Sequence, residues 1–591
     1  MPRSTFAFSN FTAGELSPRL DGRIDLPKYF SGCKTLENMI VHPHGGATRR
    51  PGTRFISATK NNGEARLVPF EFSTTQTYVL EFGNQYMRVY KDGGQVLNSG
   101  TTVEIATPYS AAEANELKFA QSADVLFIVH PSHQPRKLSR TSHVNWTLNL
   151  YAPTNNPFTS TNNFPSTVTF FEERLVFAGT NADPQKLFFS KSGDFEDMTT
   201  GTNATDGMTF TIGSDQVNAI RYIKGLRTLL IGTTGGEFVA TASSSAEPIT
   251  PTNIQIKRQA GYGTSEVDAL LAGNRILFVQ RAGKKVRELV FDFDTDGYIA
   301  PDLTILAEHI GGSGVGTGFT NWTYQQEPDS IVWVVRSDGV LTGMTYQRGE
   351  NVVAWHRHIL GGAFSGGDAV VESVAAISNS TASSKGEDTL YMIVKRTIDG
   401  GTKRYIEYLQ PFDFGSDIED AWFLDSGLVY SGSAVNSLSG LSHLEGQTVS
   451  ILANGATHAD KVVSSGAITL DRSATKVIVG LKYTSKLQTM RIESGSAEGV
   501  AQGKVKRIHE IVARFFETVG AEIGSSSVQT DLIPFRDSSM AMDQPVDLFT
   551  GDKSIEFASD YETDNFVYIQ QTQPLPMSVT ALFPQLNTYD G

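Results

Sequence analysis

The residues whose types and spacing come closest to a known chemical site form an acidic run, Asp292, Asp294 and Asp296. Carboxylates at the first, third and fifth positions, followed here by Gly297, are typical of the first half of a calcium-binding loop. The twelfth position, which should supply a bidentate glutamate, is Leu303. The flanking residues are typical of strands, so we favour a solvated acidic turn over a calcium site.

Two histidine pairs, His42 with His44 and His356 with His358, have a spacing that would place both imidazoles on one face of a strand. Zinc sites in proteins usually need three or four such ligands, and the sequence offers no evident third one. We therefore expect turn or surface histidines and predict no metal site.

Glu172 and Glu173 raise the question of glycoside hydrolysis, which needs two carboxyl groups facing each other across the substrate. Adjacent residues of one strand point to opposite faces, so this pair cannot act together, and we expect contacts with Arg174 or solvent. The sequence also contains no nucleophile elbow and no cofactor fingerprint. We therefore predict neither enzymatic activity nor a cofactor.

Positive charge gathers near the amino terminus, although the whole chain carries a net charge of −14. Arg49, Arg50 and Arg54 lie in a segment rich in glycine and proline, where tight turns are expected. This basic segment suggests either a solvated arm that wraps over the body or a docking arm that meets an acidic neighbour. We favour docking and assign it to these three arginines.

Several short segments, taken in order along the chain, carry a resemblance to one family. They are 11–18 (FTAGELSP), 22–29 (GRIDLPKY), 38–55 (NMIVHPHGGATRRPGTRF), 170–180 (FFEERLVFAGT), 190–195 (SKSGDF), 355–358 (WHRH), 425–428 (DSGL), 440–446 (GLSHLEG) and 574–576 (PLP). Together they resemble the tail nozzle proteins of short-tailed bacteriophages, of the tail tubular protein B type. Their order from one end of the chain to the other makes the resemblance more specific than any single segment.

The resemblance implies a structural virion protein, made in the host cytoplasm, that forms a homohexameric ring below a tail adaptor protein. Such a ring would conduct DNA during ejection and support tail fibres. The negative net charge agrees with DNA in transit through an acidic channel, because a dedicated nucleic-acid binder would need clustered basic residues. The alternatives are a receptor-binding, fibre-like adhesin and, less favoured, a tail-borne cell-wall hydrolase.

Composition favours an all-β fold. The chain of 591 residues contains 55 glycines and 35 phenylalanines, which suits many short strands joined by turns. The single cysteine, Cys33, excludes an intramolecular disulfide and is expected to be buried. No apolar run approaches the length of a membrane span.

Apolar and β-branched runs repeat from residue 67 to about residue 424, which leaves room for about six to eight propeller blades of about 40–50 residues. One short helix is expected at 110–117, where Ser110 and Glu113 match a capping box. We divide the chain into a basic docking arm (1–60), a β-propeller-like body (61–424), a small β-barrel or sandwich (425–495) and a carboxyl-terminal β region that closes the body (496–591).

Overall fold

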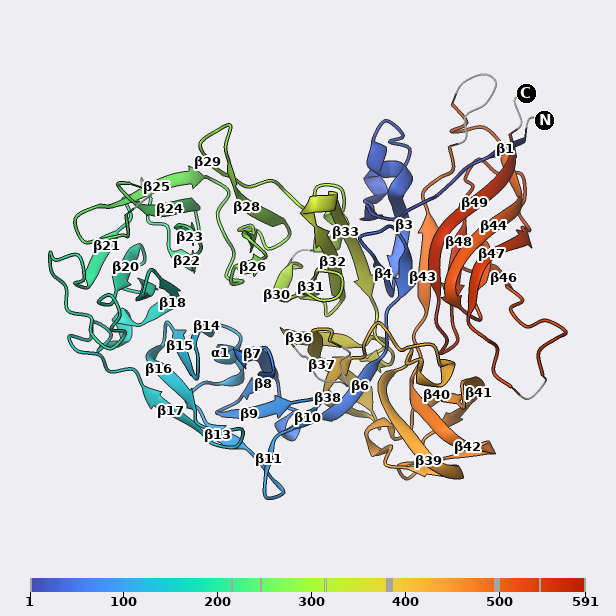
Figure 1. The fold of residues 1–591 in the computed structure, drawn as a ribbon, viewed down its shortest axis with the longest axis horizontal. Coiled ribbons are helices and arrows are strands. Elements are labelled where there is room, and N and C mark those ends of the chain that lie inside the picture. Colours follow the sequence, from blue (N-terminus) through green and yellow to red (C-terminus); the bar gives the residue numbers. More distant parts are fainter. Residues whose placement is uncertain are drawn as a thin grey trace.

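The computed structural model describes residues 3–213, 216–244, 247–312, 314, 316–378, 386–493, 500–541 and 544–588, and nearly all regular structure in these ranges is β-strand. Figure 1 shows a ring of sheets and, beside it, a lobe of packed sheets that holds both chain ends. The predicted all-β class is therefore confirmed. Within the same ranges, no helix is long and apolar enough to cross a membrane.

The ring is a β-propeller in which the described residues form seven antiparallel blades, each built on four strands, with β13 (Glu104–Ala106) as a fifth strand beside β9 in the first. The first four blades are β7 (Ala65–Ser73), β8 (Gln76–Gly83), β9 (Tyr86–Lys91) and β10 (Gly94–Gln95); β14 (Lys118–Ser122), β15 (Val125–His130), β16 (His133–Arg140) and β17 (Trp146–Leu150); β18 (Pro165–Phe171), β19 (Arg174–Thr180), β20 (Lys186–Phe189) and β21 (Met208–Thr211); and β22 (Ile220–Gly225), β23 (Leu229–Thr233), β24 (Gly236–Ala242) and β25 (Ile254–Ala260). The last three are β26 (Leu270–Ala272), β27 (Arg275–Val279), β28 (Val286–Asp292) and β29 (Gly297–Ile299); β30 (Phe319–Gln325), β31 (Ile331–Arg336), β32 (Leu341–Gln347) and β33 (Val352–His358); and β36 (Val370–Ile377), β37 (Thr389–Ile398), β38 (Gly401–Leu409) and β6 (Thr53–Ala58).

Short elements connect or extend the longer strands, in the propeller and outside it. They are β11 (Leu97–Asn98), β12 (Thr101–Thr102), β13 (Glu104–Ala106), α1 (Ala111–Ala114), β34 (Ala363–Phe364), β35 (Gly367–Asp368), and the 3-10 turns η1 (Pro18–Leu20), η2 (Pro27–Ser31), η3 (Lys60–Asn62), η4 (Thr161–Asn163), η5 (Glu308–Gly311), η6 (Arg348–Glu350), η7 (Ile418–Asp420) and η8 (Ser442–Leu444). Helix α1 begins after Ser110, and its capping box with Glu113 is confirmed.

The stacking of blades explains why some strands are apolar along their whole length. In β15, Leu126 and Ile128 pack into the core shared with the first blade. The intervening Phe127 and Val129 pack into the core shared with the third blade. Because successive side chains of a strand point to opposite faces, a strand that lies between two neighbours needs apolar residues at every position.

The ring is closed by a strand from far along the chain. Strand β6 pairs antiparallel with β38, so that Ser57 lies opposite Ile406. The core between the seventh and first blades contains Ile406, Tyr391 and Leu67. Closure therefore joins residues from near the amino terminus to the last blade, and it leaves no free sheet edge at this point of the ring.

Strand β6 also begins the next module. The sheet of the seventh blade continues through β39 (Asp425–Ser439), β42 (Ala467–Leu481), β40 (Thr448–Ala453) and β41 (Ala456–Val462). Strands β39 and β42 are long and their register shifts several times, which lets a sheet bend around a small core of its own. These strands lie within the range 425–495, for which a separate small β-barrel or sandwich was predicted, but their sheet is continuous with that of the seventh blade.

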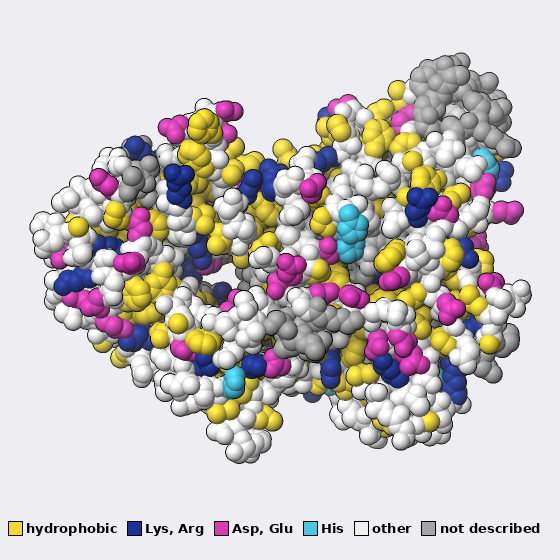
Figure 2. Space-filling model, in the orientation of Figure 1, with side chains coloured by type: hydrophobic (Ala, Val, Ile, Leu, Met, Phe, Trp, Pro, Cys, Tyr) yellow, Lys and Arg dark blue, Asp and Glu magenta, His cyan; other side chains and the backbone are white. Residues whose placement is uncertain are grey.

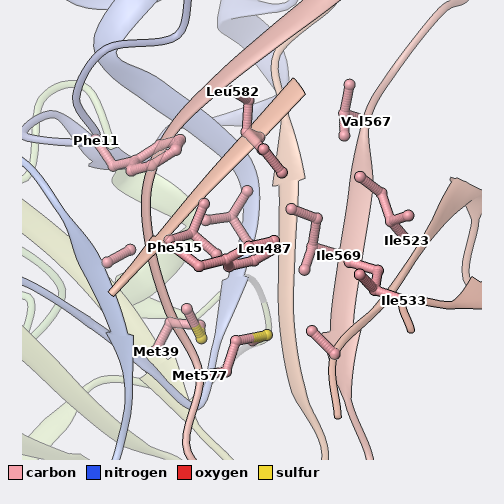
Figure 3. Close-up of a cluster of buried hydrophobic side chains, with 14 of the residues drawn as sticks. Phe11, Met39, Leu487, Phe515, Ile523, Ile533, Val567, Ile569, Met577 and Leu582 are labelled. Atoms are coloured by element: carbon pink, nitrogen blue, oxygen red, sulfur yellow. The ribbon is translucent and has the colours of Figure 1, made fainter. Parts of the chain in front are cut away.

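The remaining lobe consists of two sheets that combine both ends of the chain. One holds β4 (Met39–Val41), β5 (Ala47–Arg49), β49 (Ser578–Thr588), β44 (Lys506–Thr518) and β47 (Phe549–Glu556), with β1 (Arg3–Thr5) beside β49. The other extends the sixth blade through β2 (Gly14–Glu15), β3 (Gly32–Glu37), β43 (Ser485–Thr489), β48 (Tyr568–Gln571), β45 (Glu522–Ser526) and β46 (Gln529–Leu532). Figure 3 shows the core of this lobe, where Phe11 and Met39 from the amino-terminal part meet Phe515, Ile569 and Leu582 from the carboxyl-terminal part.

Two of the predicted module boundaries differ from the structure. Residues 1–60 are not a separate arm, because strands β1 to β6 are paired within three sheets. The predicted closing region, 496–591, does not close the propeller, because β6 closes it; the strands in the described part of that region build the lobe together with the amino-terminal strands. Sequence periodicity identifies strands but not their partners, and both differences come from pairing between distant residues.

Replacing Ile406 by alanine tests the closure of the ring. Ile406 is fully buried, and its truncation should lower the free energy of unfolding by about 2–5 kcal/mol, since a cavity would form between the seventh and first blades. Thr402→Ala, at an exposed position of the same strand, is the control. Equal unfolding curves for the two variants in urea would contradict the closure.

Candidate functional sites: a buried arginine hub and the axial channel

A buried ion pair lies where the propeller, the small module and the lobe meet. The Arg50 guanidinium donates two hydrogen bonds to the Asp425 carboxylate, at 3.0 and 2.9 Å, and neither side chain is exposed. The backbone N–H groups of Thr53 and Gly361 donate to the same carboxylate at 3.2 and 2.8 Å. Although burial disfavours the charged form of Arg50, the attraction of Asp425 raises its pKa above the ordinary value. The pair is thus held by two-point geometry and by further donors.

Arg49 binds the other side of this junction. It donates to the backbone oxygens of Gln573, Leu575 (2.9 Å) and Tyr483 (2.8 Å). Its guanidinium lies 4.5 Å from the centre of the Tyr483 ring, and that of Arg50 lies 4.2 Å from the same ring. Burial lowers the pKa of Arg49. The Tyr483 ring therefore lies against both guanidinium groups.

The network continues into the seventh blade. The Thr53 hydroxyl donates to Glu407 at 2.6 Å, and Glu407 forms a buried ion pair with Arg396. Gly52 allows the chain to pass close to the backbone of Leu424, where a Cβ atom would lie 2.1 Å from the carbonyl oxygen. A larger residue at position 52 would clash with that backbone.

These contacts correct the docking assignment for Arg49 and Arg50. Both side chains are enclosed by the chain itself, so neither is available to another molecule in this fold. Arg54 differs, because it is partly exposed, and its guanidinium lies 6.0 Å from the centre of the Trp422 ring. A docking role for Arg54 stays a prediction.

A cavity of about 1530 Å³ runs along the axis of the propeller and is lined by residues of the innermost strands. Figure 2 shows the opening, with basic and acidic side chains at its wall. Lys224 forms an ion pair with Asp268 at 2.8 Å, and Arg221 forms one with Glu266 at 3.0 Å. Lys118 donates to the backbone oxygen of Arg221. The channel of a single subunit is therefore rich in paired charges of both signs.

A second cluster contains Glu113, His130 and His133, whose potential ligand atoms all lie within 4.8 Å of one another. Glu113 accepts from Ser110, whose backbone and side-chain hydrogen bonds lower the pKa of Glu113 to about 2. Its other oxygen lies 2.9 Å from Nε2 of His133. Sequence reasoning found the capping box here but not the histidines.

Hydrogen bonding within this cluster argues against a metal ligand at His130. The backbone N–H of Ser132 donates to Nδ1 of His130 at 3.0 Å, so the proton of the neutral ring is on Nε2. Nε2 then donates to Glu116 at 3.1 Å. Burial lowers the pKa of His130, which favours this neutral form. We interpret the cluster as a hydrogen-bonded support for the turn between β15 and β16.

The three aspartates of the calcium-like run do not converge on one point. Among the described residues the metal-like grouping is Glu113 with the two histidines, not Asp292, Asp294 and Asp296. Asp292 instead accepts from the backbone and hydroxyl of Thr295, at 3.2 and 2.8 Å, and stabilises the turn between β28 and β29. The arrangement matches the favoured acidic turn and corrects the weaker calcium alternative.

The paired histidines have structural contacts. His42 lies 2.8 Å from both Asp329 and the Thr48 hydroxyl, so both of its ring nitrogens have partners. His356 and His358 are buried and hydrogen-bonded to each other at 2.7 Å. Burial lowers the pKa of His356 to about 3, which keeps this ring neutral. The expectation of surface histidines is wrong for this second pair.

Glu172 and Glu173 do not lie on a strand, as the sequence interpretation assumed. They form the two-residue turn between β18 and β19, with φ of 46° and 58°. Two consecutive positive φ angles are typical of a tight hairpin turn. Glu172 accepts from the backbone of Ile249 at 2.6 Å.

Cys33 is buried as predicted.

The sequence signals for the two main sites were weak for a simple reason. Arg50 and Asp425 are 375 residues apart, and the channel cations come from different blades. No local spacing relates such residues. An alignment of the innermost strands of the blades, based on the propeller repeat, could have identified the channel cations.

Comparisons with known proteins add little to this description. No protein-family model matches the sequence, and no curated protein is similar to it. Among solved structures, the chain is similar to the WD40 repeats of RRP9, with 10 % identity, a TM-score of 0.38, and coverage of 61 % of this chain and 99 % of that one. It is also similar to YCF48 bound to D1 peptide, with 10 % identity, a TM-score of 0.34, and coverage of 62 % of this chain and 96 % of that one. A third similar structure is BamB from Moraxella catarrhalis, with 10 % identity, a TM-score of 0.32, and coverage of 61 % of this chain and 98 % of that one. At this level they carry no argument about function, and the propeller assignment rests on strand pairing.

Asp425→Asn tests the buried arginine hub, which is the ion pair of Arg50 with Asp425 and the contacts of Arg49 beside it. The change keeps the side-chain shape but leaves the buried Arg50 without a counter-charge, so we expect a loss of about 3–5 kcal/mol in unfolding free energy. The control is Asp552→Asn, which breaks the exposed ion pair with Arg514 and should unfold close to wild type. Denaturant unfolding measures both. Equal stability of the two variants would refute the hub.

Proposed function

We propose that this chain is a subunit of the tail nozzle of a short-tailed bacteriophage. In this proposal six copies form a ring below the tail adaptor protein, conduct DNA through the space that they enclose, and support tail fibres. The role is structural and needs no catalysis or cofactor. The ordered resemblance described above is its source.

The observation that carries the proposal is that six of the nine segments with this resemblance contact others of the set. Glu15, of the first segment, forms an ion pair with Arg357 at 2.7 Å. Arg50 binds Asp425, and Arg49 binds the backbone of Leu575. Residues that are far apart in the sequence thus belong to one junction. Such a set would be expected if the resemblance reflects a shared architecture, whereas scattered chance matches would not meet.

The backbone geometry of these segments also supports a shared architecture. Gly14 has a φ of +66°, and a Cβ atom there would lie 2.5 Å from the backbone nitrogen of Trp355. His443 lies 2.9 Å from the backbone oxygen of Ser426, and its ring stacks on Phe55 at 4.1 Å. Five of the segments are therefore in close contact, in one group of two and one group of three.

A ring needs two different surfaces on each subunit, because head-to-tail contact is heterologous. Two elements that expose apolar side chains, the hairpin of β28 and β29 and strand β46, lie well apart in Figure 1. The first, at the hairpin of β28 and β29, includes Phe291 and Phe293, the latter 88 % exposed. The second includes Val528 and Leu532, beside and within β46, which is the last strand of its sheet in the described part of the chain. We propose that these surfaces meet between neighbouring copies.

Electron microscopy of particles that carry a tagged copy of this chain tests the nozzle. We expect the tag on a ring of six copies around a continuous bore below the adaptor. Label at the fibre tips, or three copies around no bore, would contradict the nozzle and favour the adhesin. A purified monomer alone would not count against it, so the assembled particle is the sample to image.

Phe293→Asp tests the proposed contact between copies. The side chain is almost fully exposed in the single subunit, so the unfolding temperature of the monomer should not change. Ring formation should weaken about tenfold or more, because a charge would enter an apolar contact. Leu97→Asp, on the separate hairpin of β11 and β12, is the matched control. Equal assembly of both variants in sedimentation experiments would exclude this surface.

A further inference from the structure

The axial channel holds a cluster of cations that successive blades bring together. Arg66 on β7 donates to the backbone oxygen of Leu117 at 2.7 Å, next to Lys118 on β14. Lys118 donates to the backbone oxygen of Arg221 on β22, and Lys224 on the same strand reaches Asp268. Each contact links one part of the ring to another, so the charged groups face the same section of the channel.

Positive charge exceeds negative charge in this section. The four cations, Arg66, Lys118, Arg221 and Lys224, face two carboxylates, Asp268 and Glu266, which leaves an excess of two positive charges. Two further acids of the wall have other contacts: Glu116 accepts a hydrogen bond from neutral His130, and Glu372 pairs with Lys395 and Arg404. The charged groups that act most strongly on Lys118 are Asp268, Lys224, Arg221 and Arg66.

Hydrogen-bonding capacity is also left over. Nε of Arg66 and Oδ1 of Asp268 are buried, and neither has a partner among the described residues. Burial, together with repulsion from the neighbouring cations, lowers the pKa of Lys118 to about 8. A cluster of this kind lacks an anion that would accept from its donors and offset its charge.

We propose that this section of the channel binds a small, doubly charged oxyanion of the phosphate class. Its oxygens would accept hydrogen bonds from Lys118, Lys224 and Arg66, and a protonated oxygen could donate to Oδ1 of Asp268. The charge of a phosphate dianion equals the local excess. The site is separate from the proposed contacts between copies, so it does not depend on the nozzle proposal.

Calorimetric titration of the full-length protein with inorganic phosphate, at constant ionic strength and pH 7.5, tests the site. Lys118→Gln and Lys224→Gln should each weaken phosphate binding about tenfold or more, because each removes a charge-assisted hydrogen bond. Lys395→Gln, a channel lysine outside the cluster, is the matched control and should bind like wild type. Asp268→Asn should tighten binding severalfold, since it removes the competing negative charge.

The opposite signs expected for Lys118→Gln and Asp268→Asn separate a binding site from a merely structural cluster, in which both changes would only affect stability.

A second measurement uses pH 8.5 and two buffers of different ionisation enthalpy. Phosphate binding should be accompanied by proton uptake, which should be lost in Lys118→Gln. Absence of phosphate binding, or equal weakening by Lys395→Gln, would overturn the proposal. Tighter binding of a short DNA duplex than of phosphate, abolished by Lys118→Gln, would overturn the assignment to a small anion.

Discussion

The architecture depends on one buried contact, the two-point ion pair between Arg50 and Asp425. Removing two charges from water costs several kcal/mol each, and the mutual attraction offsets this only where geometry and additional donors are favourable. Here the donors are the backbone groups of Thr53, close to Arg50 in the chain, and of Gly361, from the connection between the sixth and seventh blades. The pair can therefore form in full only when the amino-terminal strand, the sixth-to-seventh blade connection and the small module are all in place. The ion pair is therefore stable only when the modules are correctly arranged.

Closure of the propeller imposes a related constraint on folding. Strand β6 cannot find β38 until about 350 further residues have been synthesised, so the amino-terminal segment must wait for the last blade. The same strand then continues the sheet into β39. One short segment, Thr53–Ala58, thus joins two modules, and its neighbours Arg49 and Arg50 fix the lobe to them. The density of glycine and proline in this region serves close backbone packing.

Much of the fold could be predicted from the sequence because it is encoded locally. The alternation and length of apolar runs identified β15 and many other strands, and the capping box identified α1. Pairing partners could not be predicted, since the register of β6 with β38 leaves no local pattern. The arginines were misassigned for the same reason: charge normally signals exposure, and the carboxylate that makes burial of Arg50 possible lies in another module. The channel cluster was missed because each blade supplies only one or two of its cations.

Continuous sheets explain how the modules act as one body. The sheet of the sixth blade extends into the lobe, and that of the seventh extends into the small module, so backbone hydrogen bonds cross both boundaries. Bending at either boundary would break these pairings, which join Gly427 to Arg54 at one boundary and Gly14 to Trp355 and Glu37 to Arg357 at the other, unlike motion about a flexible linker. A subunit of this construction keeps the angle between propeller and lobe fixed. In the proposed nozzle, this rigidity would let each copy transmit its position to the next, so that the bore keeps its width while DNA passes.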